Sequence, residues 1–259
     1  MKQRITTAVV ALLVLMLVLF VVPDSVALLV IVAVMLGGAW EWSAFLNASG
    51  NAGRLAYVAT IAALIAVVSF LAVDAELILK VSMVWWLLAL IWTFFFPTPI
   101  PSVIAWLAGA LVLVPLYLAL VMLYKAEPLM LLFALLIVWV ADSGAFFAGK
   151  TLGRVKLAPK ISPGKTWEGV IGGLVAVVLL TLLWSLWVDT DLSVLVPFCL
   201  AVACISIVGD LTVSMFKRTT GIKDSGSLFP GHGGVLDRID SVAAAAPLFA
   251  LGVSWVGLQ

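Results

Sequence analysis

The chain has 259 residues, of which 65% are hydrophobic and only 10% are charged, and its formal net charge is +1. Soluble domains are about 45–50% apolar, so this composition excludes an ordinary soluble protein and indicates one that folds in a bilayer. The small net charge gives no reason to expect a nucleic-acid partner. The two cysteines, Cys199 and Cys204, share one apolar segment and form no disulfide or metal pattern.

Apolar runs of about twenty residues, the length that crosses roughly 30 Å of hydrocarbon, follow one another along the chain. We expect nine transmembrane helices, at 5–22, 26–46, 54–73, 77–96, 102–124, 129–148, 169–188, 193–209 and 242–258. Lys2 and Arg4 before the first run resemble a signal peptide, but its 18 uncharged residues exceed the ~7–15 of a signal sequence. The sequence therefore predicts an all-α, polytopic membrane helix bundle that keeps its first span.

The polar residues divide the chain into two regions. The first five runs carry almost no polar side chains apart from Glu41 and Lys80, so we interpret residues 1–125 as a transmembrane scaffold. Residues 126–259 contain the two long polar segments, which we expect to be loops at 149–168 and 210–241. This second region is therefore expected to carry the chemistry.

The basic residues indicate how the bundle is oriented. With nine spans, both long loops lie on the same face of the membrane as the N-terminus. That face would carry all of the 14 basic residues except Lys80 and Lys125. Because cytoplasmic segments are enriched in Lys and Arg, we expect both loops in the cytoplasm.

The first loop and the span before it contain the first group of candidate residues. Asp142 and Ser143 interrupt an apolar span, which indicates a functional site or, alternatively, an interhelical hydrogen bond. Gly164-Lys165-Thr166 resembles the end of a P-loop, but Pro159 replaces its first glycine and no strand is expected before it, so we reject that motif. The remaining polar residues suit phosphate contacts better than a simple positive anchor; they are Lys150, Lys156, Lys160, Ser162, Lys165, Thr166 and Glu168.

The second loop contains the acidic candidates. If the chain stays helical after residue 209, Asp210, Ser214 and Lys217 share one face, and Asp237 and Asp240 are three apart at the start of another helix. A single acid of this kind often only pairs with a base at the surface of the loop. Several acids at the ends of membrane spans, however, are costly and are usually functional. Carboxylates beside basic residues suit a Mg²⁺ ion that bridges to phosphate oxygens.

Glycines and one histidine separate these acids. The glycines would let backbone amides approach an anion, and they are Gly221, Gly226, Gly231, Gly233 and Gly234. His232 is the single histidine, so zinc binding is not expected. We expect it to contact phosphate, with simple solvation as the alternative.

Two stretches resemble a known family. The residues from Ser214 to Asp240, read as SMFKR, KDSG and PGHGGVLDRID, are similar to the signature of the phosphatidate cytidylyltransferases, also called CDP-diacylglycerol synthases. ADSGAFFAGK and SPGKTWEGVIGG resemble that family's second conserved region. The resemblance is sharp over about residues 139–250, with a small departure at Ser227-Leu228-Phe229.

The resemblance implies the reaction CTP + phosphatidate → CDP-diacylglycerol + diphosphate, dependent on Mg²⁺, at the cytoplasmic face of a bacterial inner membrane, with a second cation left open. The partners would be CTP, phosphatidate and the bilayer, with a homodimer left open. The residues expected at the site have three roles. The metal ligands would be Asp210, Asp237 and Asp240; the phosphate-holding cations would be Lys217, Arg218 and Arg238; the substrate contacts would be Asp142, Ser143, Lys150, Lys165, Ser214, Lys223, His232 and Gly233.

Two other functions fit parts of this pattern. A membrane lipid kinase that uses CTP as phosphoryl donor needs the same metal and basic groups, and its products alone would distinguish it. An ion-coupled transporter is disfavoured because the spans show no inverted repeat or broken helices and the charges gather at one interface.

Overall fold

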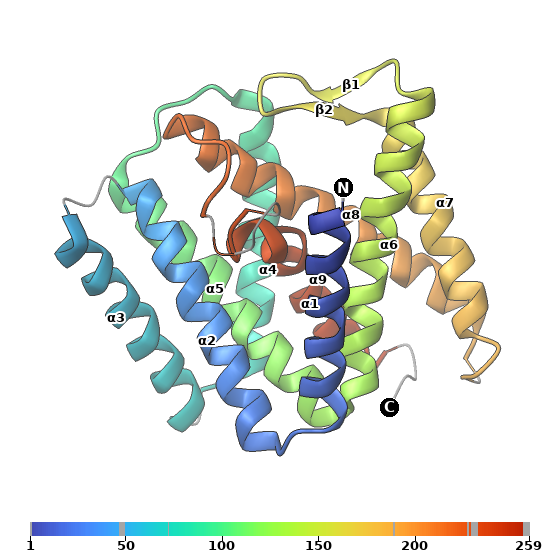
Figure 1. The fold of residues 1–259 in the computed structure, drawn as a ribbon, viewed down its shortest axis with the longest axis horizontal. Coiled ribbons are helices and arrows are strands. Elements are labelled where there is room, and N and C mark those ends of the chain that lie inside the picture. Colours follow the sequence, from blue (N-terminus) through green and yellow to red (C-terminus); the bar gives the residue numbers. More distant parts are fainter. Residues whose placement is uncertain are drawn as a thin grey trace.

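The computed structural model describes residues 2–46, 50–71, 73–188, 190–226, 228 and 233–255. These residues form nine α-helices, one 3₁₀ turn and a two-stranded hairpin (Figure 1). In chain order the elements are α1 (Lys2–Phe20), α2 (Asp24–Trp42), η1 (Ser43–Leu46), α3 (Gly50–Phe70), α4 (Ala75–Phe95), α5 (Ser102–Ala126), α6 (Pro128–Leu152), β1 (Lys156–Ala158), β2 (Ser162–Thr166), α7 (Trp167–Trp184), α8 (Leu192–Thr219) and α9 (Leu236–Gly252). The predicted helix bundle is confirmed.

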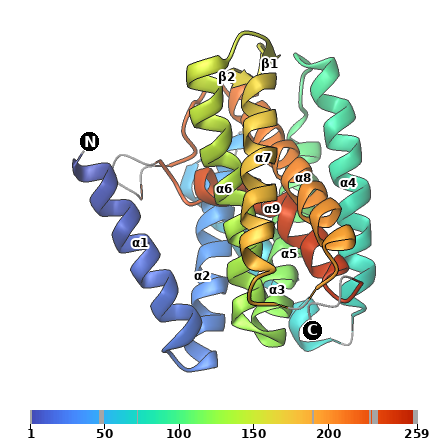
Figure 2. The same cartoon turned by 90° about the vertical axis from the view of Figure 1, so that its right-hand side faces the viewer.

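Seven helices in the described part of the chain, α2 to α8, are long and apolar enough to cross a membrane. The apolar part of α1, Val9–Phe20, and the 17-residue α9 are shorter. The multi-pass architecture is therefore confirmed, whereas nine complete crossings stay a prediction. Successive helices run in alternating directions, and the hairpin lies at one end of the bundle, above α6, α7 and α8 (Figures 1 and 2).

Helices α5 and α9 form the centre of the bundle. Most residues of α5 are buried, and α9 packs against α2, α4, α5, α6 and α8. The run Ala243–Ala246 in α9 is buried, and its small side chains let the neighbouring helices approach. On α8, a methyl group placed on Gly209 would collide with the main-chain carbonyl of Asp240. The start of α9 is therefore pressed directly against α8.

Helices α6 and α7 pack through a seam of small residues. A Cβ added to Gly173 would lie 2.6 Å from the carbonyl oxygen of Ala141, and one added to Gly144 would lie 2.8 Å from the Cβ of Ala176. Glycine permits this backbone contact, as it does between many membrane helices. The seam fixes the hairpin that connects the two helices over the end of α8.

Both expected loops are shorter than predicted. Helix α6 continues to Leu152, and a hairpin, with Lys156 opposite Thr166, occupies much of 149–168. Because β1 precedes Gly164-Lys165-Thr166 and β2 contains it, the expectation that no strand lies before these residues was wrong. The sequence SPGKT has little strand propensity of its own, so pairing with β1 determines its conformation. Helix α8 continues to Thr219, with Lys217 and Arg218 in its last turn, where the helix dipole favours cations.

Candidate active site

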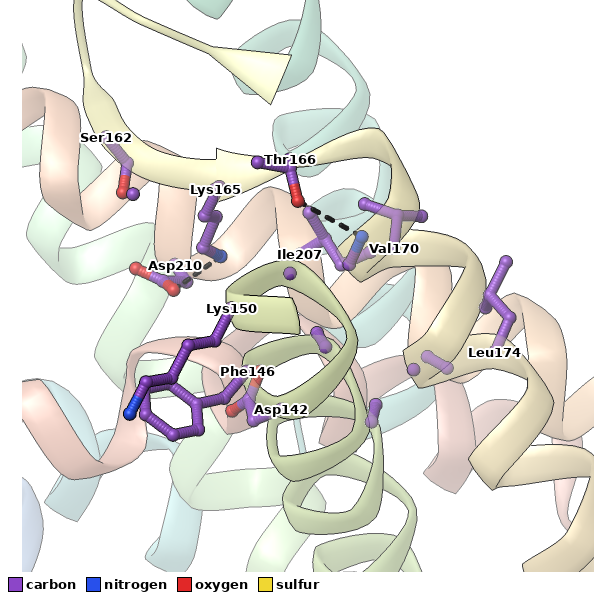
Figure 3. Close-up of a pocket in the computed structure, with 17 residues that line it drawn as sticks. Asp142, Phe146, Lys150, Ser162, Lys165, Thr166, Val170, Leu174, Ile207 and Asp210 are labelled. Carbon is purple, nitrogen blue, oxygen red and sulfur yellow. Dashed lines mark hydrogen bonds and ion pairs between the residues drawn. The ribbon is translucent and has the colours of Figure 1, made fainter. Parts of the chain in front are cut away.

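A cavity of about 530 Å³ opens between α6, β2, α7 and α8 (Figure 3). Its charged side is formed by Asp142, Lys150, Lys165 and Asp210. Its apolar side is formed mainly by side chains of α7 and α8, including Val170, Leu174, Ala203 and Ile207. One cavity therefore presents both ionic groups and a hydrocarbon-like wall.

An ion pair joins the hairpin to α8 at the charged side of this cavity. Lys165 Nζ lies 2.5 Å from Asp210 Oδ2, and the two side chains are 24% and 25% exposed. The hydroxyl of Ser214 donates to Asp210 Oδ1 at 3.1 Å. This bond confirms that Asp210 and Ser214 share one helical face, as their spacing predicted.

Two further contacts hold the hairpin in place. Thr166, at the start of α7, is buried, and its Oγ1 accepts a hydrogen bond from the amide of Gly169 at 3.1 Å, which caps the helix (Figure 3). Arg218 Nε donates to the carbonyl oxygen of Ile161 at 3.0 Å. Lys165 is therefore carried on a backbone that is fixed at both ends.

A second ion pair joins α8 to α9. Lys217 Nζ lies 2.8 Å from Asp237 Oδ1 and 3.9 Å from Asp240 Oδ2, with all three side chains about a tenth exposed. The other oxygen of Asp237 accepts from the amides of Ser225 at 3.0 Å and Gly234 at 2.9 Å. Burial alone would raise the pKa of Asp237, but the Lys217 ammonium and the Gly234 and Ser225 amides outweigh it, so this pKa lies below its usual value.

Gly233 has a positive φ of 82°, a conformation that favours glycine. A Cβ at this position would also lie 2.5 Å from Asp237 Oδ2. Gly233 therefore lets the chain turn tightly around the Asp237 carboxylate, and its expected substrate contact stays a prediction.

Gly209 of α8 lies directly against the Asp240 carbonyl of α9, so the adjacent Asp210 is close enough to Asp240 for their carboxylates to act on each other electrostatically. Lys165 and Lys217 flank the two acids. Two like charges held together in this way favour a bound cation, and Mg²⁺ typically takes only one or two protein carboxylates. Asp210 and Asp240 match this donor set, but each lies beside a lysine, Lys165 and Lys217 respectively, so their role as Mg²⁺ ligands stays a prediction.

The expected cluster of three carboxylates is not found among the described residues. No group of three or more His, Cys, Asp or Glu side chains in these ranges is arranged to hold a metal ion. Both oxygens of Asp237 are engaged, by Lys217 on one side and by two backbone amides on the other. Asp237 thus lies beside the Asp210–Asp240 pair and is linked to it only through the Lys217 ammonium.

The remaining predicted residues lie around this centre. Asp142 is exposed within the cavity and lies within electrostatic range of Lys165, Asp210 and Arg238. Lys150 also lines the cavity, with its Nζ 5.9 Å from the ring centre of Phe146. Three others are exposed outside the cavity lining, namely Ser143, Lys223 and Arg238. His232 lies outside the described residues.

Sequence reasoning did not anticipate that Glu41 of α2 contacts the segment next to the site. Its carboxylate accepts hydrogen bonds from Ser225, Val235 and Leu236. The interpretation of residues 1–125 as a scaffold stays a prediction. The available signal was an acid in the middle of an apolar run, which is costly unless it has a role.

Comparison with known proteins extends the resemblance to the whole chain. A model of the cytidylyltransferase family matches residues 2–256. The phosphatidate cytidylyltransferase of Pseudomonas aeruginosa is 44% identical over 96% of each chain. The one from Haemophilus influenzae is 36% identical over 96% of this chain and 97% of its own length. The one from Staphylococcus aureus strain COL is 47% identical over 46% of each chain.

Proposed function

This chain belongs to the cytidylyltransferase family and is a nucleotidyltransferase, and on that premise we propose that it transfers the cytidylyl group of CTP to phosphatidate. The products would be CDP-diacylglycerol and diphosphate. The full-length relatives named for this activity support the proposal.

The observation that carries the proposal is the two-sided cavity. Its charged side holds Lys165 and Asp210, and its apolar side holds Val170, Leu174 and Ile207. A lipid phosphate has both an anionic head and a hydrocarbon body, so it requires both kinds of surface in one place. A water-soluble nucleotide would reach the same charged groups from the end of the bundle where the hairpin lies (Figure 2).

In the proposed reaction an oxygen of the phosphatidate phosphate attacks the α-phosphorus of CTP. The bond from the α-phosphorus to the oxygen that bridges to the β-phosphorus breaks, and diphosphate leaves with that bonding pair. The nucleophile is already ionised, so no strong general base is needed. Because both reactants are anions, catalysis depends on positioning and on cations that neutralise the developing charge.

In this proposal the basic residues of the site supply the neutralising charge. Lys165 approaches from the hairpin and Lys217 from the end of α8. Arg218 adds a cation beside the hairpin, and Arg238 follows at the start of α9. Ser214 holds the Asp210 carboxylate in a fixed orientation through its hydroxyl. We assign the phosphate contacts to these four cations.

Asp210 and Asp240 would hold Mg²⁺, which when bound would offset negative charge on the phosphate oxygens. Asp237 would keep the Lys217 ammonium in position, because its Oδ1 accepts from that ammonium at 2.8 Å. The ion pair of Asp237 and Lys217 thereby supports Asp210 and Asp240, and Asp237 itself would not be a metal ligand.

We also propose that the enzyme is located in the bacterial inner membrane, with this site on the cytoplasmic face. The concentration of basic residues in 150–165 and 217–238 supports that orientation. Accessibility of a single cysteine introduced at Lys160 to a membrane-impermeant thiol reagent, in intact cells and in inverted vesicles, tests it.

The activity is tested with purified protein, phosphatidate in detergent micelles and CTP labelled at the α-phosphate. We expect label in CDP-diacylglycerol, release of diphosphate, and no product without Mg²⁺. The variant Asp210→Asn is the matched control and should be inactive. Release of CDP together with a newly phosphorylated lipid would instead identify a lipid kinase and refute the proposal.

A further inference from the structure

One face of α2 is pressed against the first turn of α9. A Cβ added to Gly37 would lie 3.3 Å from Cγ2 of Val235, and one added to Gly38 would lie 3.3 Å from Cδ1 of Ile239. Glu41 follows at spacings of four and three residues, so it projects from the same helical face. The two glycines therefore bring α2 close enough for Glu41 to reach the backbone of α9.

Glu41 is only 8% exposed, and its carboxylate is satisfied entirely by segments about 190 residues away. Oε2 accepts from the hydroxyl of Ser225 at 2.7 Å and from the amide of Leu236 at 2.8 Å. Oε1 accepts from the amide of Val235 at 2.9 Å. Among the described residues, no Lys, Arg or His forms a salt bridge with Glu41. A buried carboxylate is tolerated only when it is paired in this way.

These bonds give α9 a cap that its own sequence lacks. The residue before α9 is Val235, which has no side chain able to accept a hydrogen bond, and no side-chain cap is formed there. A carboxylate at a helix N-terminus satisfies free amides and interacts favourably with the helix dipole. Glu41 supplies that carboxylate from another helix.

Glu41 and Asp237 accept hydrogen bonds from consecutive backbone amides of the same segment. The amide of Gly234 donates to Asp237, whereas those of Val235 and Leu236 donate to Glu41. Ser225 contributes its amide to Asp237 and its hydroxyl to Glu41. The position of Asp237, and of the Lys217 ammonium bound to it, therefore depends on the segment that Glu41 holds.

The helix that carries Glu41 is itself anchored. The next residue, Trp42, is fully buried and its Nε1 donates to the carbonyl oxygen of Ala105 at 2.9 Å. Its ring packs against Phe216 of α8, with ring centres 5.1 Å apart. Phe216 directly precedes Lys217, so α2 and α8 are fixed to each other next to the site.

We propose that Glu41 is a positioning residue for the transfer reaction. From the N-terminal region it fixes Ser225 and the start of α9, and thereby sets Asp237 and Lys217 beside the Asp210–Asp240 pair. This inference rests on the proposed function.

The test replaces Glu41 by Gln, which keeps the volume but places an NH₂ group against an N–H donor. Groups that orient the residues of a metal or catalytic site typically contribute about 10–100-fold to activity. We expect Glu41→Gln to lower kcat at least about tenfold, with the KM for CTP changed less than about twofold. The matched control is Glu76→Gln, the same chemical change at an exposed acid on α4 that pairs with Lys80.

Hydrogen exchange provides a second measurement that does not depend on activity. The amides of Val235 and Leu236 should exchange at least about tenfold faster in Glu41→Gln, whereas those of α5 should be unchanged. If Glu41→Gln does not fold, Ser225→Ala removes a single donor and should give a smaller loss of kcat in the same direction.

A third comparison uses the space next to the carboxylate. A methyl group on Gly226 would collide with the Glu41 carboxylate, so Gly226→Ala should lower kcat in the wild-type background. In the Glu41→Ala background, where that carboxylate is absent, the same change should cost less than about twofold further.

The outcomes separate the two claims. A wild-type protein that makes no CDP-diacylglycerol refutes the proposed function, and with it a role for Glu41 in that reaction. An active wild type with normal kcat in Glu41→Gln refutes the positioning role alone. Faster exchange without loss of kcat also refutes it, because Glu41 would then only cap the helix.

Discussion

Replacing Lys217 by Met should destabilise the protein strongly, because it removes the ammonium from a buried pair and leaves its partners charged. Lys217 lies 2.8 Å from Asp237 and 3.9 Å from Asp240, with side chains only about a tenth exposed. Breaking such a pair by removing one partner costs about 3–5 kcal/mol. For a chain of this size each kcal/mol corresponds to roughly 2–4 °C in Tm, so we expect a fall of roughly 10 °C in detergent.

The matched control is Lys80→Met. Lys80 pairs with Glu76, but the two side chains are 58% and 62% exposed. An exposed pair contributes about 0–1 kcal/mol, so Lys80→Met should shift Tm by no more than roughly 4 °C. Both variants are measured by thermal unfolding followed through tryptophan fluorescence, at equal protein and detergent concentrations.

The same reasoning also predicts how the loss of Tm in Lys217→Met depends on pH. The pKa of Asp237 is lowered in the folded protein, so its pairing stabilises the fold above the unfolded pKa of about 4 and is lost as pH falls through the folded pKa. In Lys217→Met, Asp237 keeps its two backbone donors but loses the ammonium, so protonating it costs the variant less than the wild type. The difference in Tm between wild type and Lys217→Met should therefore narrow as pH falls below about 4. A Tm loss no larger than that of Lys80→Met, or a difference that stays constant with pH, would refute the reasoning.

Three further predictions concern the site and the seam. Asp240→Asn should abolish formation of CDP-diacylglycerol while leaving membrane insertion intact, and normal turnover in that variant would remove Asp240 from the metal site. Lys165→Ala should raise the KM for CTP about tenfold or more, since it removes a charge-assisted contact worth about 1.5–3 kcal/mol; an unchanged dependence of rate on CTP would contradict that role. Gly173→Val should lower Tm by several degrees, because the added side chain meets the Ala141 carbonyl at the seam of α6 and α7, and the exposed substitution Gly164→Ala, where a Cβ has open space, is its control.

Helical spacing predicted part of the site correctly. Asp210, Ser214 and Lys217 share one face of α8, and Ser214 donates to Asp210 as that spacing requires. Asp237 lies in the first turn of α9, and Asp240 follows directly after that turn, so both stand near the start of a helix as expected. Their partners nevertheless differ, because Asp237 accepts from the free amide of Gly234 before the helix, whereas Asp240 lies toward Lys217 of α8 and accepts from the amide of Ser241.

The hairpin and Glu41 show why other features were missed. The sequence SPGKT, which forms β2, does not show the alternation typical of strands. It is extended because β1 pairs with it and because Arg218 donates a hydrogen bond to the carbonyl oxygen of Ile161. Glu41 appeared only as an isolated acid in an apolar run. Its partners Ser225, Val235 and Leu236 are far away in the chain, and two of the three bonds use backbone amides that leave no mark on the sequence.

The sequence alone determined that the protein folds in a lipid bilayer and which family it belongs to. A chain that is 65% hydrophobic must place its helices in a bilayer, and its motifs are specific enough to identify relatives; its basic residues predict which face is cytoplasmic. Only the tertiary structure decided which carboxylates lie close together, which form ion pairs with lysine, and which accept hydrogen bonds from backbone amides. In a membrane protein, lipid-facing and buried helix faces are equally apolar, so the pattern of hydrophobic residues does not specify which helices are in contact. Here the charged groups are brought together by close helix packing at glycines such as Gly37, Gly38 and Gly209.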